Sequence, residues 1–257
     1  MQTRNLIHFG CSYAIGNGVP EYIPDLPLRV AHMAHKDKEY TLKKYKFEAK
    51  TPYPCGNYIA DKLGFNFKRE AQNGSSNERV FRKLLETNLR NARVLIGLTS
   101  DNRREGLTTR KKNSHWHTWK IVERGMPTKH KDQVFDPWGE EYIPAILEEC
   151  QIKTIIQIIY MQSFLKTENI PYLMFNAMWN GFDQPKTTEC KDLLNKVDEN
   201  YFYNLRGTFD ECQHGWCIKE KLHVSDADEH PNLQGQLAWG EKLLPMAQKI
   251  LINNNND

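Results

Sequence analysis

The sequence predicts an α/β protein in which a mostly parallel sheet lies between two layers of helices. Short apolar strands alternate with helices along most of the 257 residues, and this alternation is typical of a parallel sheet covered on both faces. Hydrophobic residues make up 39% of the chain and charged residues 26%, which is ordinary for a protein with a real core. The length suits one large domain with insertions, or two small domains, and we expect the former.

Four strands are expected, at residues 6–9, 65–71, 93–99 and 170–175. The first is short and apolar and ends at Gly10. The third is a continuous apolar run, which is typical of a strand buried on both faces. Each of the first three is followed along the chain by a polar segment.

Four helices are expected, at residues 53–63, 75–91, 142–165 and 233–252. Gly64 ends the first helix, and Ser75 or Ser76 caps the second. Apolar residues recur at helical spacing on one side of the second and third helices. The last five residues, 253–257, are four Asn and one Asp and are expected to be a frayed, disordered tail.

Three stretches break the alternation, at about 19–51, 103–140 and 181–224. We interpret them as insertions that shape or cover a cleft within one domain of residues 1–252, since two of them follow strands. The basic segment 103–131 contains His115, Trp116, His117 and Trp119 and could contact nucleic acid, but a solvated loop over the cleft is favoured. The pair Cys212 and Cys217 lacks the spacing and the second pair of a zinc site.

Composition limits the setting and the partners of the protein. The six cysteines are scattered and no secretory signal precedes the first strand, so reduced thiols in a cytoplasm are expected, or in a virion if the protein is virus-encoded. No apolar run approaches the roughly 18 residues of a membrane span. A net charge of +3 does not identify a partner, and the oligomeric state cannot be read from the sequence.

Three polar segments lie where α/β proteins gather their site residues. Ser12 follows the first strand, and a serine hydroxyl becomes a useful nucleophile only beside a base. His230 precedes the last helix and follows Asp226 and Asp228, which could orient it. Gly74, before the second helix, offers an N–H toward a developing oxyanion. Each segment taken alone also fits a plain turn, a helix cap or a surface histidine.

Together these segments resemble the SGNH, or GDSL, hydrolase superfamily, and most closely its divergent phage-type members. In that family, blocks follow the first three strands and a His-containing block precedes the last helix. The matching segments here are Gly10-Cys11-Ser12, Gly74-Ser75-Ser76-Asn77, Gly97-Leu98-Thr99-Ser100 and Asp228-Glu229-His230-Pro231. The resemblance covers nearly the whole chain and implies a three-layer α/β/α sandwich with a flavodoxin-like strand order.

The resemblance also implies a function. The chain would be an esterase that cleaves an acyl or acetyl ester of a small molecule or a glycan. Ser12 would attack the acyl carbon, His230 would transfer the proton, and Asp228 would orient His230. The N–H groups of Ser12 and Gly74 would bind the oxyanion, and no metal or organic cofactor would be used.

Two positions, Thr99 and Asp228, depart from the family pattern, and a third, Arg103, matches only its phage-type members. Thr99 stands where an Asn side chain usually donates to the oxyanion, so Thr99, Asn102 or Asn77 would have to substitute; losing such a donor costs about 3 kcal/mol. Arg103 resembles an arginine of the phage-type members and would bind a substrate anion, brace its loop, or form an ion pair with Glu105 or another acid. Asp228 is one residue closer to His230 than usual.

These departures also favour a second hypothesis. The chain would keep the hydrolase fold but have lost efficient catalysis, and would serve as a binding or structural protein, for instance in a phage particle. A third hypothesis, a nucleic-acid-binding protein that uses the basic segment 103–131, is less favoured.

Overall fold

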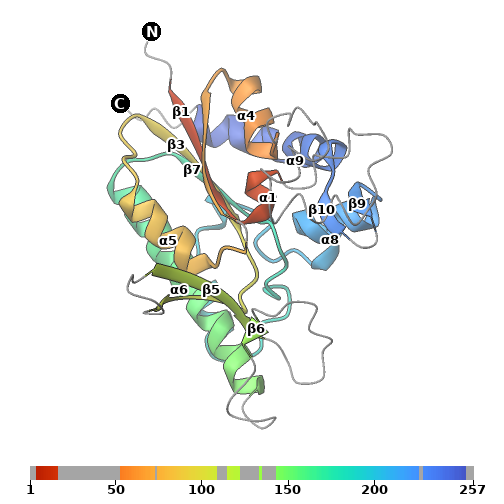
Figure 1. Ribbon diagram of the computed structural model, residues 1–257. Coiled ribbons are helices and arrows are strands. Elements are labelled where there is room, and N and C mark those ends of the chain that lie inside the picture. The colour runs from red at the N-terminus through yellow and green to blue at the C-terminus, as the bar shows by residue number, and fades with distance from the viewer. Residues whose placement is uncertain are drawn as a thin grey trace.

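A five-stranded parallel sheet forms the centre of the protein (Figure 1). The computed structural model describes residues 4–16, 53–72, 74–108, 115–121, 133–134, 143–225 and 228–252. The strands follow the order β2-β1-β3-β7-β8, and every neighbouring pair is parallel. They are β1 (Asn5–Gly10), β2 (Asn66–Ala71), β3 (Ala92–Leu98), β7 (Tyr172–Asn176) and β8 (Phe202–Tyr203). This order is the flavodoxin-like one that the family resemblance implies.

Helices cover both faces of the sheet, because side chains of the central strands alternate between two apolar clusters. Leu6 and Leu95 face α4 (Cys55–Leu63) and α9 (Leu233–Leu251), where Trp239 and Leu243 are buried. Ile7, Phe9, Val94 and Ile96 face the opposite cluster, to which α5 (Asn77–Glu86), α6 (Ile143–Thr167) and α7 (Thr188–Leu194) contribute. Figure 1 shows α4 and α9 on one side of the sheet and α5 and α6 on the other. The predicted three-layer α/β/α sandwich is confirmed.

One predicted helix is shorter than the sequence suggests. The expected helix at 75–91 is α5, which begins after its cap Ser76 and ends at Glu86. Thr87 adopts an extended backbone, and its hydroxyl and N–H both bond to the carbonyl of Lys83. Leu89 is therefore buried from a loop, not from the helix, and Leu85 is exposed.

Two of the predicted insertions contain regular structure. Residues 103–140 include β4 (Arg103–Thr108), β5 (His115–Ile121) and β6 (Gln133–Val134), which form a separate three-stranded sheet. The expectation of a plain solvated loop there is wrong, because the aromatic run at 115–121 pairs along its length with β4. The insertion at 19–51 and the tail at 253–257 lie outside the described residues.

The stretch at 181–224 is more than a cover, because it supplies the fifth strand, β8, of the main sheet. It also contains short helical turns at Glu199–Tyr201 and Phe209–Glu211, the helix α8 (Gln213–Lys219) and the strand β9 (His223–Ser225). The strand β9 pairs antiparallel with β10 (Asp228–Pro231) just before α9. Within the described residues, no helix combines the length and apolar character that a membrane span requires.

Candidate active site

The predicted site segments meet at the carboxyl edge of the sheet. The chain leaves β1 for β2 on one side and later returns to form β3 on the other side, so the strand order reverses at β1 and β3. Parallel α/β sheets bind ligands in the crevice at such a point. Ser12 follows β1, Gly74 follows β2 and Thr99 follows β3.

Ser12 and His230 form the central contact of this edge. Ser12 begins the short helix α1 (Ser12–Ile15), and its Oγ lies 2.9 Å from Nε2 of His230. The pair joins positions 218 residues apart in the chain, so the contact is made only by the tertiary fold. A hydroxyl within hydrogen-bond reach of an imidazole is the arrangement that activates a serine nucleophile.

A tight turn at Gly10 brings Ser12 to its position. A Cβ atom on Gly10 would lie 2.8 Å from the Cβ of Ala14 and 3.0 Å from the carbonyl oxygen of Gly97. These distances are too short for any side chain, so glycine lets β1, β3 and α1 approach closely. Ser12 is 6% exposed and stands at the first helical position, where the main-chain N–H has no intrahelical partner.

His230 is held by the hairpin that precedes α9. Asn232 caps α9 by accepting a hydrogen bond from the N–H of Gly235, at 2.8 Å, and its own N–H donates to the carbonyl of Leu222. The ring of Tyr13 lies 5.3 Å from the ring of His230 at an angle of 34°. Helix α1 also contacts β10, and Figure 1 shows the two elements side by side. Packing therefore fixes the imidazole beside Ser12.

The predicted partner of His230 is placed only in part. Asp228 is the first residue of β10, where it pairs with Ser225. Its side chain and the whole of Asp226 lie outside the described part of the structure. The orientation of His230 by either carboxylate stays a prediction.

Thr99 and Asn77 form a clip rather than a pair of donors aimed at the cleft. The side-chain amide of Asn77 donates to the carbonyl of Thr99 at 3.0 Å, and its oxygen accepts the N–H of Thr99 at 2.9 Å. The hydroxyl of Thr99 accepts a bond from Arg103 at 2.8 Å and donates to the sulfur of Met178 at 3.6 Å. Thr99 is fully buried. The predicted role of these two side chains as oxyanion donors gains no support from this geometry.

Gly74 lies in the turn before α5 and has a φ of 69°, which favours glycine. Within the described residues, neither Gly74 nor Ser12 donates its main-chain N–H to another residue. Both N–H groups can therefore serve a ligand at this edge, and their role in binding an oxyanion stays a prediction.

Arg103, the predicted anion-binding residue, is the first residue of β4 and is partly buried. Its Nη1 atom bonds to the hydroxyl of Thr99 at 2.8 Å and to the carbonyl of Ser75 at 3.5 Å. The alternative ion pair with Glu105 is wrong, because both carboxylate oxygens of Glu105 bond to Arg82, at 2.9 and 3.0 Å. Arg103 therefore braces the edge through neutral groups.

Sequence reasoning missed a second histidine at the site. Nε2 of His214 lies 2.9 Å from a carboxylate oxygen of Glu229, and the ring of His214 lies 5.7 Å from that of Tyr13. Burial lowers the pKa of His214, Glu229 opposes that shift, and the charges of His230 and Arg103 add to it. The sequence holds one signal for this contact: the partners of His214, Glu229 and Tyr13, are sequence neighbours of His230 and Ser12.

A buried glutamine ties together the helices that flank the site. Oε1 of Gln236 accepts the N–H of Cys55 at 3.0 Å and the side-chain amide of Gln213 at 3.1 Å. Its Nε2 donates to the carbonyl of Tyr13 at 3.2 Å. Gln236 and Gln213 are fully buried. One side chain of α9 therefore links α1, α4 and α8.

The cysteines are packed inside the protein. All six are buried and none forms a disulfide. Cys212 caps α8 through its sulfur, which accepts the N–H of Gly215 at 3.4 Å. Burial raises the pKa of Cys212 to about 11 and that of Cys55 to about 12, which keeps both as neutral thiols. The described residues contain no group of three or more side chains suited to a metal ion.

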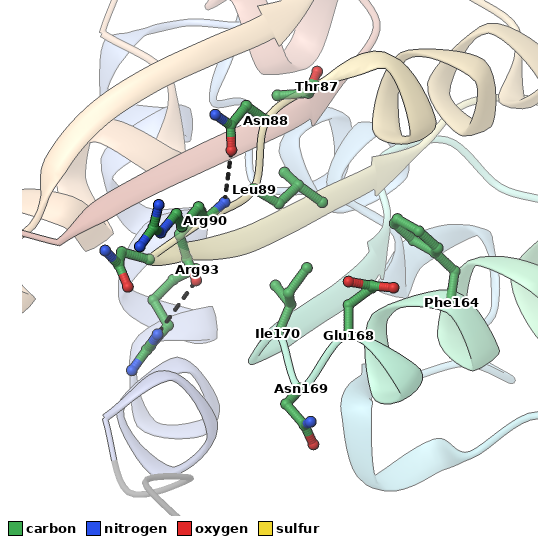
Figure 2. A pocket seen from close by; sticks show the side chains of 11 residues that line it. Thr87, Asn88, Leu89, Arg90, Arg93, Phe164, Glu168, Asn169 and Ile170 are labelled. Carbon is green, nitrogen blue, oxygen red and sulfur yellow. Dashed lines mark hydrogen bonds between the residues drawn. The ribbon is translucent and has the colours of Figure 1, made fainter.

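A cavity of about 650 Å³ lies elsewhere, at the amino ends of β3 and β7 (Figure 2). Its walls include Leu89, Arg90 and Arg93 on one side and Glu168 and Ile170 on the other. None of the predicted site residues lines it, so it is distinct from the edge that carries Ser12.

Comparison with known proteins finds likeness only among solved structures. No family model matches the chain, and no curated protein matches it. An acetyl xylan esterase, Est2A, from the rumen bacterium Butyrivibrio proteoclasticus matches with 12% identity and a TM-score of 0.47, over 97% of this chain and 64% of its own. A carbohydrate esterase family 2 enzyme with a carbohydrate-binding domain, from Corynascus thermopiles (Myceliophthora fergusii), matches with 15% identity and a TM-score of 0.44, over 95% of this chain and 65% of its own. This chain thus spans less than two thirds of either structure.

Proposed function

We propose that this protein is a serine hydrolase of the SGNH type that cleaves an acyl or acetyl ester. The observation that carries the proposal is the 2.9 Å contact between Oγ of Ser12 and Nε2 of His230 at the carboxyl edge of the sheet. The proposal rests on this pair and its surroundings, not on the overall likeness to the two esterase structures. Acetylated glycans and small acyl esters are the substrates to test.

In the first half of the reaction, Oγ of Ser12 attacks the acyl carbon while its proton passes to Nε2 of His230. The carbonyl oxygen takes up the displaced electron pair and becomes an oxyanion, which the N–H groups of Ser12 and Gly74 bind. The bond between the acyl carbon and the leaving oxygen then breaks, and His230 returns the proton to that oxygen. An alcohol leaves and an acyl-enzyme remains.

In the second half, a water molecule attacks the acyl carbon and gives a proton to His230. The bond to Oγ of Ser12 breaks, His230 returns the proton to that oxygen, and a carboxylic acid leaves. The net reaction converts one ester and one water into an acid and an alcohol. Asp228 would orient His230 and stabilise its charged form during both steps.

The first prediction concerns Ser12. The purified protein should hydrolyse p-nitrophenyl acetate, and Ser12→Ala should lower kcat by roughly a thousandfold or more. A fluorophosphonate probe should label the wild type, with the adduct mapped to Ser12 by mass spectrometry. Ser163→Ala, an exposed serine on α6, should hydrolyse the ester and take the label as the wild type does. Equal rates for the wild type and Ser12→Ala would refute the assignment.

One observation favours the second candidate, a hydrolase-like protein with weak catalysis. The side chains of Thr99 and Asn77 bond to protein groups, so neither supplies the side-chain donor that the family usually has. For this candidate, the fluorophosphonate probe should leave Ser12 unlabelled in a protein whose folding is otherwise normal.

A further inference from the structure

Arg103 lies at the carboxyl end of β1, the strand that leads into Ser12. Its Nη1 bonds to Ser75, in the segment after β2, and to Thr99, in the segment after β3. Because β1 lies between β2 and β3 in the sheet, these two segments flank the carboxyl end of β1. The N–H of Gln72 also bonds to the carbonyl of Gly10, which ties the segment after β2 to the end of β1. The guanidinium is therefore held next to the segment that contains Ser12.

The positive charge of Arg103 has no counter-charge on the described protein. Three acids of this region bond elsewhere: Glu105 to Arg82, Glu78 to the N–H of Glu105, and Glu229 to His214. No described carboxylate lies within ion-pair distance of Arg103. A cation that has lost part of its contact with water gains from a negative charge placed beside it, so a developing anion at this position would be stabilised.

The guanidinium also has unused donors. A guanidinium carries five N–H groups, and the bonds to Thr99 and Ser75 both use Nη1. Within the described residues, Nε and Nη2 donate to no other group. Neutral groups therefore hold Nη1 in place, and the N–H groups of Nε and Nη2 can donate to an anion.

The charge reaches the surroundings of the Ser12–His230 pair. Burial raises the pKa of Tyr13, and the charge of Arg103 acts against that shift. Arg103 also contributes to the lowered pKa of His214, after burial. The ring of Tyr13 packs against the ring of His230, and the ring of His214 packs against that of Tyr13. The charge of Arg103 thus lowers the pKa of both aromatic side chains, Tyr13 and His214, that lie beside the Ser12–His230 pair.

We infer that Arg103 is the side-chain donor of the oxyanion hole and takes the place of the Asn that SGNH hydrolases usually carry. This role rests on the proposed serine-hydrolase function. When the bond from Oγ of Ser12 to the acyl carbon forms, the carbonyl electron pair moves onto the oxygen, and an N–H of Arg103 donates to it. The guanidinium stays protonated throughout, so it stabilises charge and transfers no proton. Thr99 is then a positioning residue whose hydroxyl holds Nη1.

The test uses a neutral ester, because an oxyanion forms on every ester whereas a binding site for a substrate anion serves only charged ones. Arg103→Met should lower kcat for p-nitrophenyl acetate by roughly a hundredfold, with KM nearly unchanged. Arg103→Lys keeps the positive charge and serves as the test if Arg103→Met folds poorly. Its kcat should lie between those of the wild type and Arg103→Met. Arg90→Met, an exposed arginine at the amino end of the sheet, should match the wild type.

A double-mutant cycle tests the link to Thr99. Thr99→Val should lower kcat by about tenfold in the wild type and have little effect in Arg103→Met, because the hydroxyl acts through Arg103. A merely structural role would lower the melting temperature of both backgrounds alike and leave no such coupling in kcat.

The outcomes distinguish a failure of the role of Arg103 from a failure of the proposed serine-hydrolase function. If the wild type shows no Ser12-dependent hydrolysis, the proposed function fails and the role of Arg103 falls with it. If the wild type is active and Arg103→Met keeps full kcat on the neutral ester, only the role of Arg103 is overturned. A loss confined to an anionic ester, such as a p-nitrophenyl hemisuccinate, would equally overturn it and would make Arg103 a receptor for a substrate anion.

Discussion

Single side chains hold the carboxyl edge of the sheet in shape, and Asn77 is the clearest case. Its amide satisfies both the N–H and the carbonyl of Thr99, and all of these groups are buried. Asn77→Ala should lower the free energy of unfolding by roughly 2–4 kcal/mol, because it leaves two buried main-chain groups unpaired. Denaturant unfolding monitored by circular dichroism would measure this loss.

The matched control for Asn77 is Asn88, an exposed asparagine whose side-chain oxygen accepts the N–H of Arg90 and, among the described residues, no other group. Asn88→Ala should change the free energy of unfolding by less than about 1 kcal/mol. Similar losses for the two variants would show that the clip at Thr99 does not stabilise the protein.

The sequence could point to some of these residues and not to others. Ser12 and His230 each lie at the end of an element that apolar periodicity defines, so their positions follow from local pattern. The partners of Thr99 and Arg103 do not, because they depend on which side chains of other elements reach the same edge. Glu105 pairs with Arg82 of α5 instead of its sequence neighbour Arg103, and no local signal specifies that choice.

At the scale of secondary-structure elements, Gln236 of α9 holds α1, α4 and α8 in position relative to one another. It bonds to the first N–H of α4, where the cap Pro54 has no side-chain acceptor, and to the carbonyl of Tyr13 in α1. Gln236→Met keeps the length of the side chain but removes the acceptor of two buried donors, the N–H of Cys55 and the side-chain amide of Gln213, and one of the two bonds to the carbonyl of Tyr13. We expect a loss of roughly 3 kcal/mol or more in the free energy of unfolding.

The same variant should also lower kcat, because α1 carries Ser12 and α9 follows directly after His230. Gln234→Met, an exposed glutamine in the first turn of α9, should leave stability and kcat unchanged within about 0.5 kcal/mol. Thermal unfolding and p-nitrophenyl acetate kinetics on both variants provide the comparison. A Gln236→Met protein as stable and active as Gln234→Met would contradict the role of the network.

The elements themselves were predictable in proportion to their length. The four long helices and the four apolar strands carry clear periodicity, and their positions hold to within a few residues, apart from the early end of α5. The fifth strand, β8, has only two residues and lies in a polar stretch, so periodicity gives no sign of it. The sheet of β4, β5 and β6 was missed because its aromatic and basic residues fit a binding loop equally well.

On the scale of the whole molecule, the strand order explains why distant segments form one site. Reversal of the order at β1 and β3 brings the ends of β1, β2 and β3 to one edge, and α9 places the hairpin with His230 beside them. The same arrangement places β1 inside the sheet, between β2 and β3, with one apolar cluster on each of its faces. A disturbance within β1 therefore acts on the stability of the entire fold.

His8, in the middle of β1, makes that stability depend on pH. It is fully buried, neither ring nitrogen has a hydrogen-bond partner among the described residues, and a Cβ on Gly56 would lie 2.5 Å from its Nδ1. Burial lowers the pKa of His8 to about 3, and the charge of Arg69 adds to the shift. The unfolded chain has the ordinary value near 6.5. Above that pH the side chain is neutral in both states, so it does not contribute to the change of stability with pH.

Between pH 6.5 and 3, His8 is protonated in the unfolded chain but stays neutral in the folded protein. Stability therefore falls as the pH falls. His8 should contribute a slope of up to about 1.4 kcal/mol per pH unit in this window. Urea unfolding of His8→Met should give a shallower dependence between pH 6.5 and 4 and little change in slope above pH 7. Leu6→Met, which alters a buried, non-titrating side chain of the same strand, should shift stability equally at every pH. If His8→Met and the wild type lose stability in parallel on acidification, the proton is taken up elsewhere and His8 does not govern the acid stability of the fold.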